Sequence, residues 1–250
     1  MKDILTLLAE GAISIDDAER QLKLFAVHEL QGMANLDIGR NKRVGKPDVV
    51  RARGKTNEQV MTLVAPILDE AGLVIISGAT KEHHRLLTQQ KQDIEINFDP
   101  DAAVLVAKKN DYKLRDISGR ISIITAGTSD IPVALQSKIV LDAFEVDLDI
   151  YHDVGIAGLH RLLSAVEKVI ENDTAVIIAV AGQEGGLAPV LAGLVDIPVI
   201  GVPTSTGTGF GGDGIAALST MLQSCSLGLS VVNIDNGLAA AIVALTILRK

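Results

Sequence analysis

Cys225 is the only cysteine of the chain, and a thiolate is a side chain that can bond covalently to a substrate. It falls between a helix predicted over 214–224 and a strand predicted over 229–234. Serines flank it and Gly228 follows, so its surroundings are polar. We interpret Cys225 as a nucleophile facing a site built from strand-end loops. The alternative is a small buried apolar residue, which is what an isolated cysteine usually is.

Three acidic residues lie in predicted loops where acid–base or binding chemistry could use them. Glu184 lies between glycines, where a structural carboxylate has little to do, and we predict a base or a ligand-binding acid. Asp235 is either part of a turn or a buried loop carboxylate. Asp130 either accepts hydroxyl groups of a ribose or caps the helix that starts at Ile131.

Three small-residue turns, AGTSD, AGQEGG and PTSTGTG, each follow a predicted strand. Glycines let the backbone approach an anion, and helix N-termini offer free N–H groups to it. The turns therefore predict a small ligand that carries phosphate. Their candidate binding residues are Gly127, Thr128, Ser129, Asp130, Gly182, Gly185, Gly186, Thr204 and Ser205. None of the turns is a Walker A loop or a G-x-G-x-x-G after the first strand, which disfavours a standard NAD(H) oxidoreductase site.

A basic stretch over 37–55 contrasts with the net charge of −8. It includes Arg40, Arg43 and Lys55, and it is either a phosphate or carboxylate clamp or a solvated loop. His83 and His84 are adjacent in a predicted helix, so they do not face the same way, and we expect both at the surface rather than on a shared metal.

Composition limits the class of protein. Hydrophobic residues make up 48% of 250 residues, whereas aromatic residues make up 2%. This balance favours a parallel α/β core and argues against nucleic-acid modules that stack bases on aromatic rings. No segment predicts a signal peptide or a membrane span, and one cysteine forms no internal disulfide. We expect a protein of the reducing cytoplasm.

The first part of the chain predicts a small domain over 1–115. Residues 1–34 predict helices, with Ser14 as an N-cap. A helix over 57–71, a strand over 73–77 and a helix over 81–92 follow. Further strands are predicted over 94–97 and 102–106. The fold of this domain is therefore α/β.

Regular alternation of strands and helices fills 116–250, the predicted catalytic domain. The strands are predicted over 121–125, 146–151, 175–180, 198–202 and 229–234, and the helices over 131–144, 159–172, 187–195, 214–224 and 238–248. Short strands alternating with helices imply right-handed βαβ units and a doubly wound parallel sheet.

The segment over 121–250 resembles the aminoimidazole ribonucleotide carboxylases and mutases. The shared features are the turn Gly127–Asp130, the pair His160–Arg161, the glycine-rich loop over 181–186 and the PVIGVP of 198–203. The resemblance implies a flavodoxin-like layered fold. In that family the glycine-rich loop carries a histidine that transfers protons, and this chain has Glu184 in that loop and no histidine.

Nearly the whole chain is similar to the LarB family, the pyridinium-3,5-biscarboxylic acid mononucleotide synthases of nickel-pincer cofactor biosynthesis. The motifs are LDIGR, GKT at Gly54, DVGIAGLHR at Asp153, PTSTGTG, SC at Ser224 and VVNIDNG at Val231. The resemblance implies that nicotinic acid adenine dinucleotide gains a carboxylate from CO2 or bicarbonate at ring carbon 5 and that its phosphoanhydride is cleaved to release AMP.

In that reaction the Cys225 thiolate adds to the ring, and Glu184, or in second place Asp235, removes the proton from carbon 5. Ser129, Asp130, Asp153, His160, Arg161 and the glycine turns hold ribose, phosphate and carboxylate, and the basic stretch holds the second phosphate or the AMP half. We expect magnesium to assist at the anhydride, with no organic cofactor, although no metal ligand set is readable. The resemblance also implies a homo-oligomer, an octamer. From composition and charge we expect no nucleic acid partner, and from the lack of long apolar runs no membrane partner.

Two other functions stay open. One is a purine-pathway aminoimidazole ribonucleotide carboxylase or mutase, in which Cys225 is dispensable and a histidine occupies the loop over 181–186. The other is a non-catalytic nucleotide-binding protein, in which the Cys225 thiol is inert.

Overall fold

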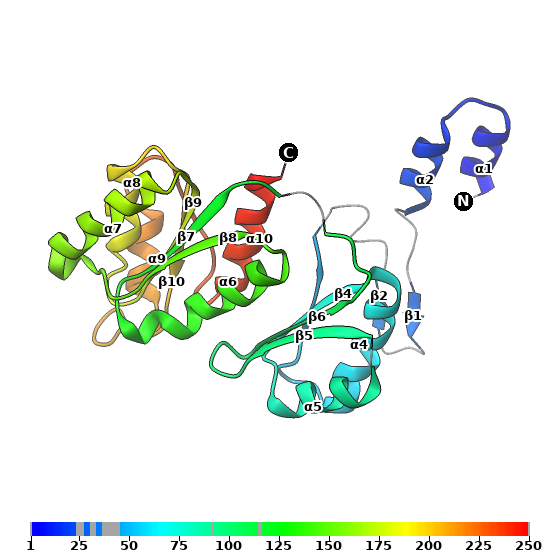
Figure 1. Cartoon of the computed structure of the whole chain (residues 1–250), viewed down its shortest axis with the longest axis horizontal. Helices are drawn as coiled ribbons and strands as arrows, with labels where there is room; N and C mark the ends of the chain where they lie inside the picture. Colours follow the sequence, from blue (N-terminus) through cyan, green and yellow to red (C-terminus); the bar gives the residue numbers. More distant parts are fainter. Residues whose placement is uncertain are drawn as a thin grey trace. The chain divides into compact units, whose positions relative to one another are not determined.

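We describe the protein from a computed structural model, which describes residues 2–23, 28–30, 34–36, 46–91, 93–114 and 117–249 (Figure 1). The chain divides into two compact units. The first comprises residues 1–98 and 104–112, and the second comprises residues 99–103 and 113–250. The division after residue 112 is three residues from the predicted domain boundary after residue 115. Each unit is described by itself.

The first unit begins with a helical hairpin, α1 (Lys2–Ala9) and α2 (Ile15–Lys23). The predicted N-cap is present, because the Ser14 hydroxyl accepts a hydrogen bond from the Asp17 N–H. Strands β1 (His28–Leu30) and β2 (Ala34–Leu36) then pair antiparallel. The prediction of helix as far as residue 34 is therefore wrong at His28–Leu30 and at Ala34. Short apolar runs fit a strand period as well as a helix period, and here strand pairing decides.

A four-stranded mixed sheet follows in the order β3-β4-β6-β5. The strands are β3 (Asp48–Arg51), β4 (Leu73–Ser77), β5 (Ile94–Asp99) and β6 (Val104–Lys109). Helix α4 (Asn57–Ala71) and β4 have the predicted bounds. The helix begins at a capping box formed by Thr56 and Gln59, and Gly72 ends it in the left-handed conformation. Helix α5 (Lys81–Gln90) carries the two histidines.

His83 is buried, with 3% of its surface exposed, so the expectation that it lies at the surface is wrong. Its Nδ1 accepts a hydrogen bond from the Thr80 N–H at the start of α5. Burial lowers the pKa of His83, because the imidazolium loses its hydration, and the charge of Glu82 opposes this only in part. His84 is half-buried and stacks on Phe98.

The second unit contains a five-stranded sheet in the order β11-β10-β9-β7-β8, and every pairing in it is parallel. Its strands are β7 (Arg120–Thr125), β8 (Asp147–Tyr151), β9 (Thr174–Ala181), β10 (Val199–Pro203) and β11 (Leu229–Val231). The central strands β9 and β10 are rich in aliphatic residues and are buried except at Ala175, as expected for strands covered on both faces. This order is flavodoxin-like, and the expected doubly wound α/β fold is confirmed.

Helices cover both faces of this sheet (Figure 1). Helix α6 (Ile131–Ala143) packs against α10 (Gly237–Leu248) on one face. On the other face, α7 (Leu159–Glu171) and α8 (Leu187–Leu194) share a core with Met221 of α9 (Ile215–Leu222). The chain leaves β7 toward the first face and leaves β9 toward the second. The point between these adjacent strands is a topological switch point, where α/β sheets bind ligands.

Candidate active site

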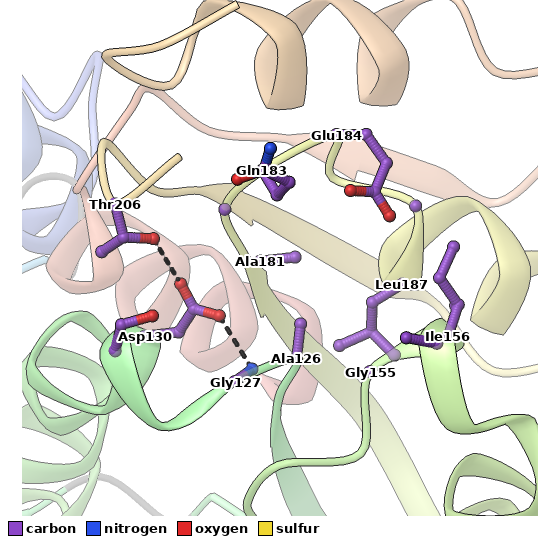
Figure 2. Close-up of a pocket in the computed structure, with 14 residues that line it drawn as sticks. Ala126, Gly127, Asp130, Gly155, Ile156, Ala181, Gln183, Glu184, Leu187 and Thr206 are labelled. Carbon is purple, nitrogen blue, oxygen red and sulfur yellow. Dashed lines mark hydrogen bonds between the residues drawn. The ribbon is translucent and has the colours of Figure 1, made fainter. Parts of the chain in front are cut away.

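A cleft of about 290 Å³ opens at the carboxyl edge of the five-stranded sheet (Figure 2). Four strand-end loops line it, and the loops after β7 and β9 supply most of the surface. The lining residues are Ala126, Gly127, Ser129, Asp130, Gly155, Ile156, Ala157, Ala181, Gly182, Gln183, Glu184, Gly186, Leu187 and Thr206. The cleft therefore lies at the switch point between β7 and β9.

Asp130 joins the loops after β7 and β10 from within the wall of the cleft. Its carboxylate is buried and accepts hydrogen bonds from the Gly127 N–H at 3.0 Å, the Thr204 hydroxyl at 2.6 Å and the Thr206 hydroxyl at 3.0 Å. The expectation that Asp130 caps α6 is therefore wrong, because it makes no side-chain cap bond to that helix. Three protein donors already bind its carboxylate. Asp130 is a positioning residue.

Two glycines allow the loops to approach this closely. A Cβ on Gly182 would lie 2.2 Å from the Thr206 hydroxyl oxygen and 2.6 Å from that of Thr204. A Cβ on Gly155 would lie 2.7 Å from the carbonyl oxygen of Ala126, to which Gly155 donates its N–H. The network around Asp130 and the floor of the cleft therefore both require glycine.

Glu184 is exposed and lies at the cleft, on the side lined by Leu187 and Ile156 (Figure 2). The described residues offer its carboxylate no hydrogen-bond or ion-pair partner. The preceding residue, Gln183, has a left-handed backbone, and its Oε1 accepts a hydrogen bond from the Thr208 N–H. The backbone before Glu184 is thus held in place while its carboxylate is free for a substrate.

Asp235 lies outside the cleft lining. Its Oδ1 accepts the Ser205 N–H at 2.8 Å, and its own N–H donates to the Pro203 carbonyl. Asp235 thus ties the end of β10 to the turn after β11. The geometry favours turn chemistry over the second-choice role as a base.

Asp153 and Arg161 form an ion pair beside the loop after β8. Both are partly exposed, and neither lines the cleft. Gly158 accommodates the guanidinium, since a Cβ there would lie 2.8 Å from Arg161 Nε. His160 is exposed near the start of α7 and is likewise outside the lining.

Cys225 lies at the opposite edge of the sheet. It is exposed and precedes β11, whose first residue, Leu229, pairs in parallel with Val199, the first residue of β10. The amino edge and the carboxyl edge are separated by at least the length of β10, which is about 13 Å for five residues. Within one copy of the chain, the expectation that Cys225 faces the strand-end loops is therefore wrong. A residue just before a parallel strand lies at the edge away from the residues that follow the strands.

The cleft gathers only part of the candidate set. Gly127, Ser129, Asp130, Gly182, Glu184 and Gly186 line it, whereas Thr128, Gly185, Thr204 and Ser205 belong to the same loops without lining it. Lys55 lies in the first unit, exposed, and donates to the Arg51 carbonyl. The predictions for Arg40 and Arg43 fall outside the described residues.

Sequence reasoning missed Ile156, Leu187, Gln183 and Thr206 as lining residues. Thr206 and Gln183 lie within the small-residue turns, so the signal for both was present. Ile156 and Leu187 are apolar residues near helix starts, and no sequence pattern distinguishes them from core residues.

Among the described residues, no group of three or more His, Cys, Asp or Glu side chains could hold a metal ion. The two carboxylates that line the cleft, Asp130 and Glu184, belong to no such group. None of the helices in the described part of the chain is long and apolar enough to cross a membrane.

Comparison with known families matches both parts of the chain. Residues 120–250 match the AIR carboxylase family, and residues 27–109 match the LarB/PurE-like N-terminal domain. The first match includes the whole cleft and Cys225.

Similar proteins include one that spans nearly the full length. "Uncharacterized protein MJ0165" of Methanocaldococcus jannaschii is 40% identical over 98% of this chain and 95% of its own length. The N5-carboxyaminoimidazole ribonucleotide mutase of the same organism is 36% identical over 51% of this chain and 78% of its own. The mutase of Pyrococcus abyssi is 36% identical over 52% of this chain and 73% of its own.

Proposed function

The chain belongs to the AIR carboxylase family and has a carboxylase- or mutase-related function; from this premise we propose a specific reaction. The substrate is nicotinic acid adenine dinucleotide with CO2 or bicarbonate. The products are pyridinium-3,5-biscarboxylic acid mononucleotide and AMP. The match of residues 27–109 to the LarB/PurE-like N-terminal domain supports this choice.

One observation carries the proposal. Glu184 presents a carboxylate with no partner among the described residues at the switch-point cleft, and none of the lining residues is a histidine. A proton-transferring histidine in this loop is what the resemblance to the purine enzymes implies. A carboxylate in its place favours removal of a proton from carbon, which a general base performs.

The chemistry starts from an electron-poor ring. A pyridinium carbon 5 does not attack CO2, but addition of the Cys225 thiolate to the ring gives a neutral dihydropyridine whose carbon 5 is nucleophilic. Attack on CO2 forms the new C–C bond. Glu184 then takes the proton from carbon 5, and expulsion of the thiolate restores the aromatic ring. Water cleaves the phosphoanhydride and releases AMP.

Cys225 reaches such a ring only from another copy of the chain, because its own cleft lies at the far edge of the sheet. Its neighbours Leu222 and Leu227 are exposed, at 64% and 90%. Exposed apolar side chains gathered at one place are typical of surfaces that another chain covers. We therefore extend the proposal to a homo-oligomer, an octamer in the LarB resemblance, in which the Cys225 of one copy completes the cleft of a neighbour.

The remaining binding roles follow the chemistry of the loops. The N–H groups at the start of α8 and the Ser129 hydroxyl suit a phosphate or the ring carboxylate. Arg161 suits an anion once Asp153 releases it. Magnesium, if it assists, would arrive on the substrate's phosphates.

The similarity to N5-carboxyaminoimidazole ribonucleotide mutases supports a second candidate. In that function the cleft would bind a ribonucleotide of aminoimidazole, and Cys225 would be dispensable.

Product analysis separates the two. The protein and its Cys225→Ala variant are incubated with nicotinic acid adenine dinucleotide and labelled bicarbonate, and intact protein mass and small products are measured. We expect a labelled dicarboxylated mononucleotide and AMP from the unaltered protein only. Turnover of carboxyaminoimidazole ribonucleotide by both proteins, with no pyridinium product, would instead establish the second candidate.

A further inference from the structure

Phe210 is the most exposed large apolar side chain among the described residues, with a relative exposure of 111%. The protein has four phenylalanines, two tyrosines and no tryptophan. An aromatic side chain usually stabilises the folded protein through burial, and a benzyl group left in water makes no such contribution. Phe210 therefore stands out as a side chain whose partner lies outside this chain.

The loop that carries Phe210, residues 204–214, is attached to the wall of the cleft. Thr206 lines the cleft and donates to Asp130, and the Thr208 N–H donates to Oε1 of Gln183, another lining residue. Gly207 lies against Gln183, since a Cβ there would be 2.8 Å from the Gln183 nitrogen. Phe210 is only two residues beyond Thr208, about 7 Å of chain.

The tip of the loop borders open space at Gly209. Gly209 has a left-handed backbone, and a Cβ there would contact nothing within 4 Å. The far side is held again where Ala216 donates its N–H to Gly211. The loop backbone is thus held on both sides of Phe210, while the Phe210 side chain lies in solvent.

The cleft lacks one face for a planar ring. Ile156, Leu187 and Ala126 give apolar surface on one side. Its lining residues include no aromatic side chain, and the cleft is partly open to solvent. A flat heterocycle bound there would keep one face in water unless a further group covered it.

We propose that Phe210 is a specificity-determining residue whose ring stacks on the heterocycle of the bound nucleotide and closes the open side of the cleft. This inference rests on the proposed function for the identity of the ring. A cationic pyridinium suits the face of a phenyl ring through a cation–π interaction, and such contacts contribute a factor of about 2 to 30 in affinity.

The chain offers a direct probe, because Phe210→Trp introduces its only tryptophan. The ligand is nicotinic acid mononucleotide, which carries the pyridinium ring and has no anhydride to cleave. Pyridinium rings quench stacked indole, so we expect saturable quenching in Phe210→Trp. Ile170→Trp is the matched control, since Ile170 is exposed on α7 near its carboxyl end and away from the cleft, and its emission should not respond.

Affinity measurements add a second readout. Phe210→Ala and Phe210→Leu should each weaken binding of the mononucleotide by about 2- to 30-fold. The affinities of these two variants should differ by no more than about threefold. Phe210→Tyr should keep the affinity of the unaltered protein, because tyrosine retains the aromatic face. Leucine keeps apolar bulk but has no π face, so full rescue by leucine would contradict stacking.

The outcomes separate the two proposals. Quenching by carboxyaminoimidazole ribonucleotide but not by the pyridinium ligand would support stacking and overturn the proposed substrate. Binding of the pyridinium ligand by calorimetry without quenching would overturn the role of Phe210 and leave the proposed function intact. Emission that changes with protein concentration rather than with ligand would assign Phe210 to a contact between copies, and would also overturn the inference.

Discussion

The carboxylate of Asp130 accepts a 2.6 Å hydrogen bond from the hydroxyl of Thr204, across 74 residues of sequence. Asp130 follows β7, and Thr204 follows β10, two strands away in the sheet. The bond is buried, so it fixes the relative position of two strand-end loops at the cleft. The shape of the binding site therefore depends on a carboxylate that is already held by three protein donors.

Replacing Asp130 with asparagine should destabilise the second unit by about 1–3 kcal/mol, because the new amide presents N–H groups where the carboxylate accepts them. Urea unfolding measures the change. Asp142→Asn in α6, the helix that follows Asp130, is the control, since Asp142 pairs with Lys138 in a partly exposed i,i+4 pair that contributes at most about 0.5 kcal/mol. Equal effects at the two positions would contradict the positioning role of Asp130.

Gly182→Ala should disrupt ligand binding and stability together, because the added Cβ would overlap the hydroxyl oxygens of Thr206 and Thr204. Gly193→Ala is the matched control. Gly193 lies in helix α8 with 3.5 Å of clearance to Ser226 Oγ, so alanine there should be neutral or stabilising by up to about 1 kcal/mol. A Gly182→Ala variant that binds nucleotide as tightly as the unaltered protein would show that the cleft does not need the Asp130 network.

Glu184→Gln should lower kcat by about 100-fold or more and change nucleotide affinity little, because the amide keeps the shape of the side chain but cannot take a proton. Steady-state kinetics with nicotinic acid adenine dinucleotide provides kcat, and calorimetry with nicotinic acid mononucleotide provides the affinity. Glu167→Gln, at a residue outside the cleft lining, controls for loss of charge. An unchanged kcat in Glu184→Gln would exclude Glu184 as the base.

His83 should make the first unit less stable in acid. Burial lowers its pKa in the folded state, so below the unfolded value of about 6.5 the unfolded chain binds more protons than the folded chain. The stability associated with neutral His83 is complete above that pH and declines as the pH falls through the lowered pKa. Protonation of Nδ1 would also remove the acceptor for the Thr80 N–H.

Urea unfolding at several pH values between 8 and 5 tests this expectation. Each unit is followed by a probe of its own, and the midpoint of the first unit is compared across the pH range. His83→Gln should flatten the pH dependence, and His84→Gln should leave it in place. Identical pH profiles for all three proteins would show that His83 titrates as it does in the unfolded chain.

The sequence predicts the five parallel strands of the second unit to within a few residues, because aliphatic runs and small-residue turns mark buried strands and their ends. The prediction for β11 extends three residues too far, since the chain beyond Val231 turns toward α10. Periodicity does not place His83, whose burial depends on what packs over α5. Nor does it reveal that Thr204 and Thr206 meet Asp130.

The placement of Cys225 shows a different limit. Its position before β11 follows from the sequence, and parallel topology then places it at the amino edge of the sheet. The polarity of its neighbours suggested reactivity, but local polarity carries no information about which edge a residue occupies. The order of helices and strands around Cys225 was predicted correctly. The expectation that Cys225 lies near the strand-end loops of the same chain did not follow from that order and is wrong.

The measurement that tests the account most directly is complementation between two inactive variants. Chains carrying Cys225→Ala and chains carrying Glu184→Gln are co-expressed with different tags, purified as mixed assemblies and assayed for the dicarboxylated mononucleotide. If one copy supplies Cys225 to the cleft of its neighbour, about a quarter of the sites in a random mixture contain both intact residues, and activity returns although each variant alone is inactive. Mixed assemblies that contain both chains and remain inactive would contradict the shared site, and a fully active Cys225→Ala protein would contradict covalent catalysis by this cysteine.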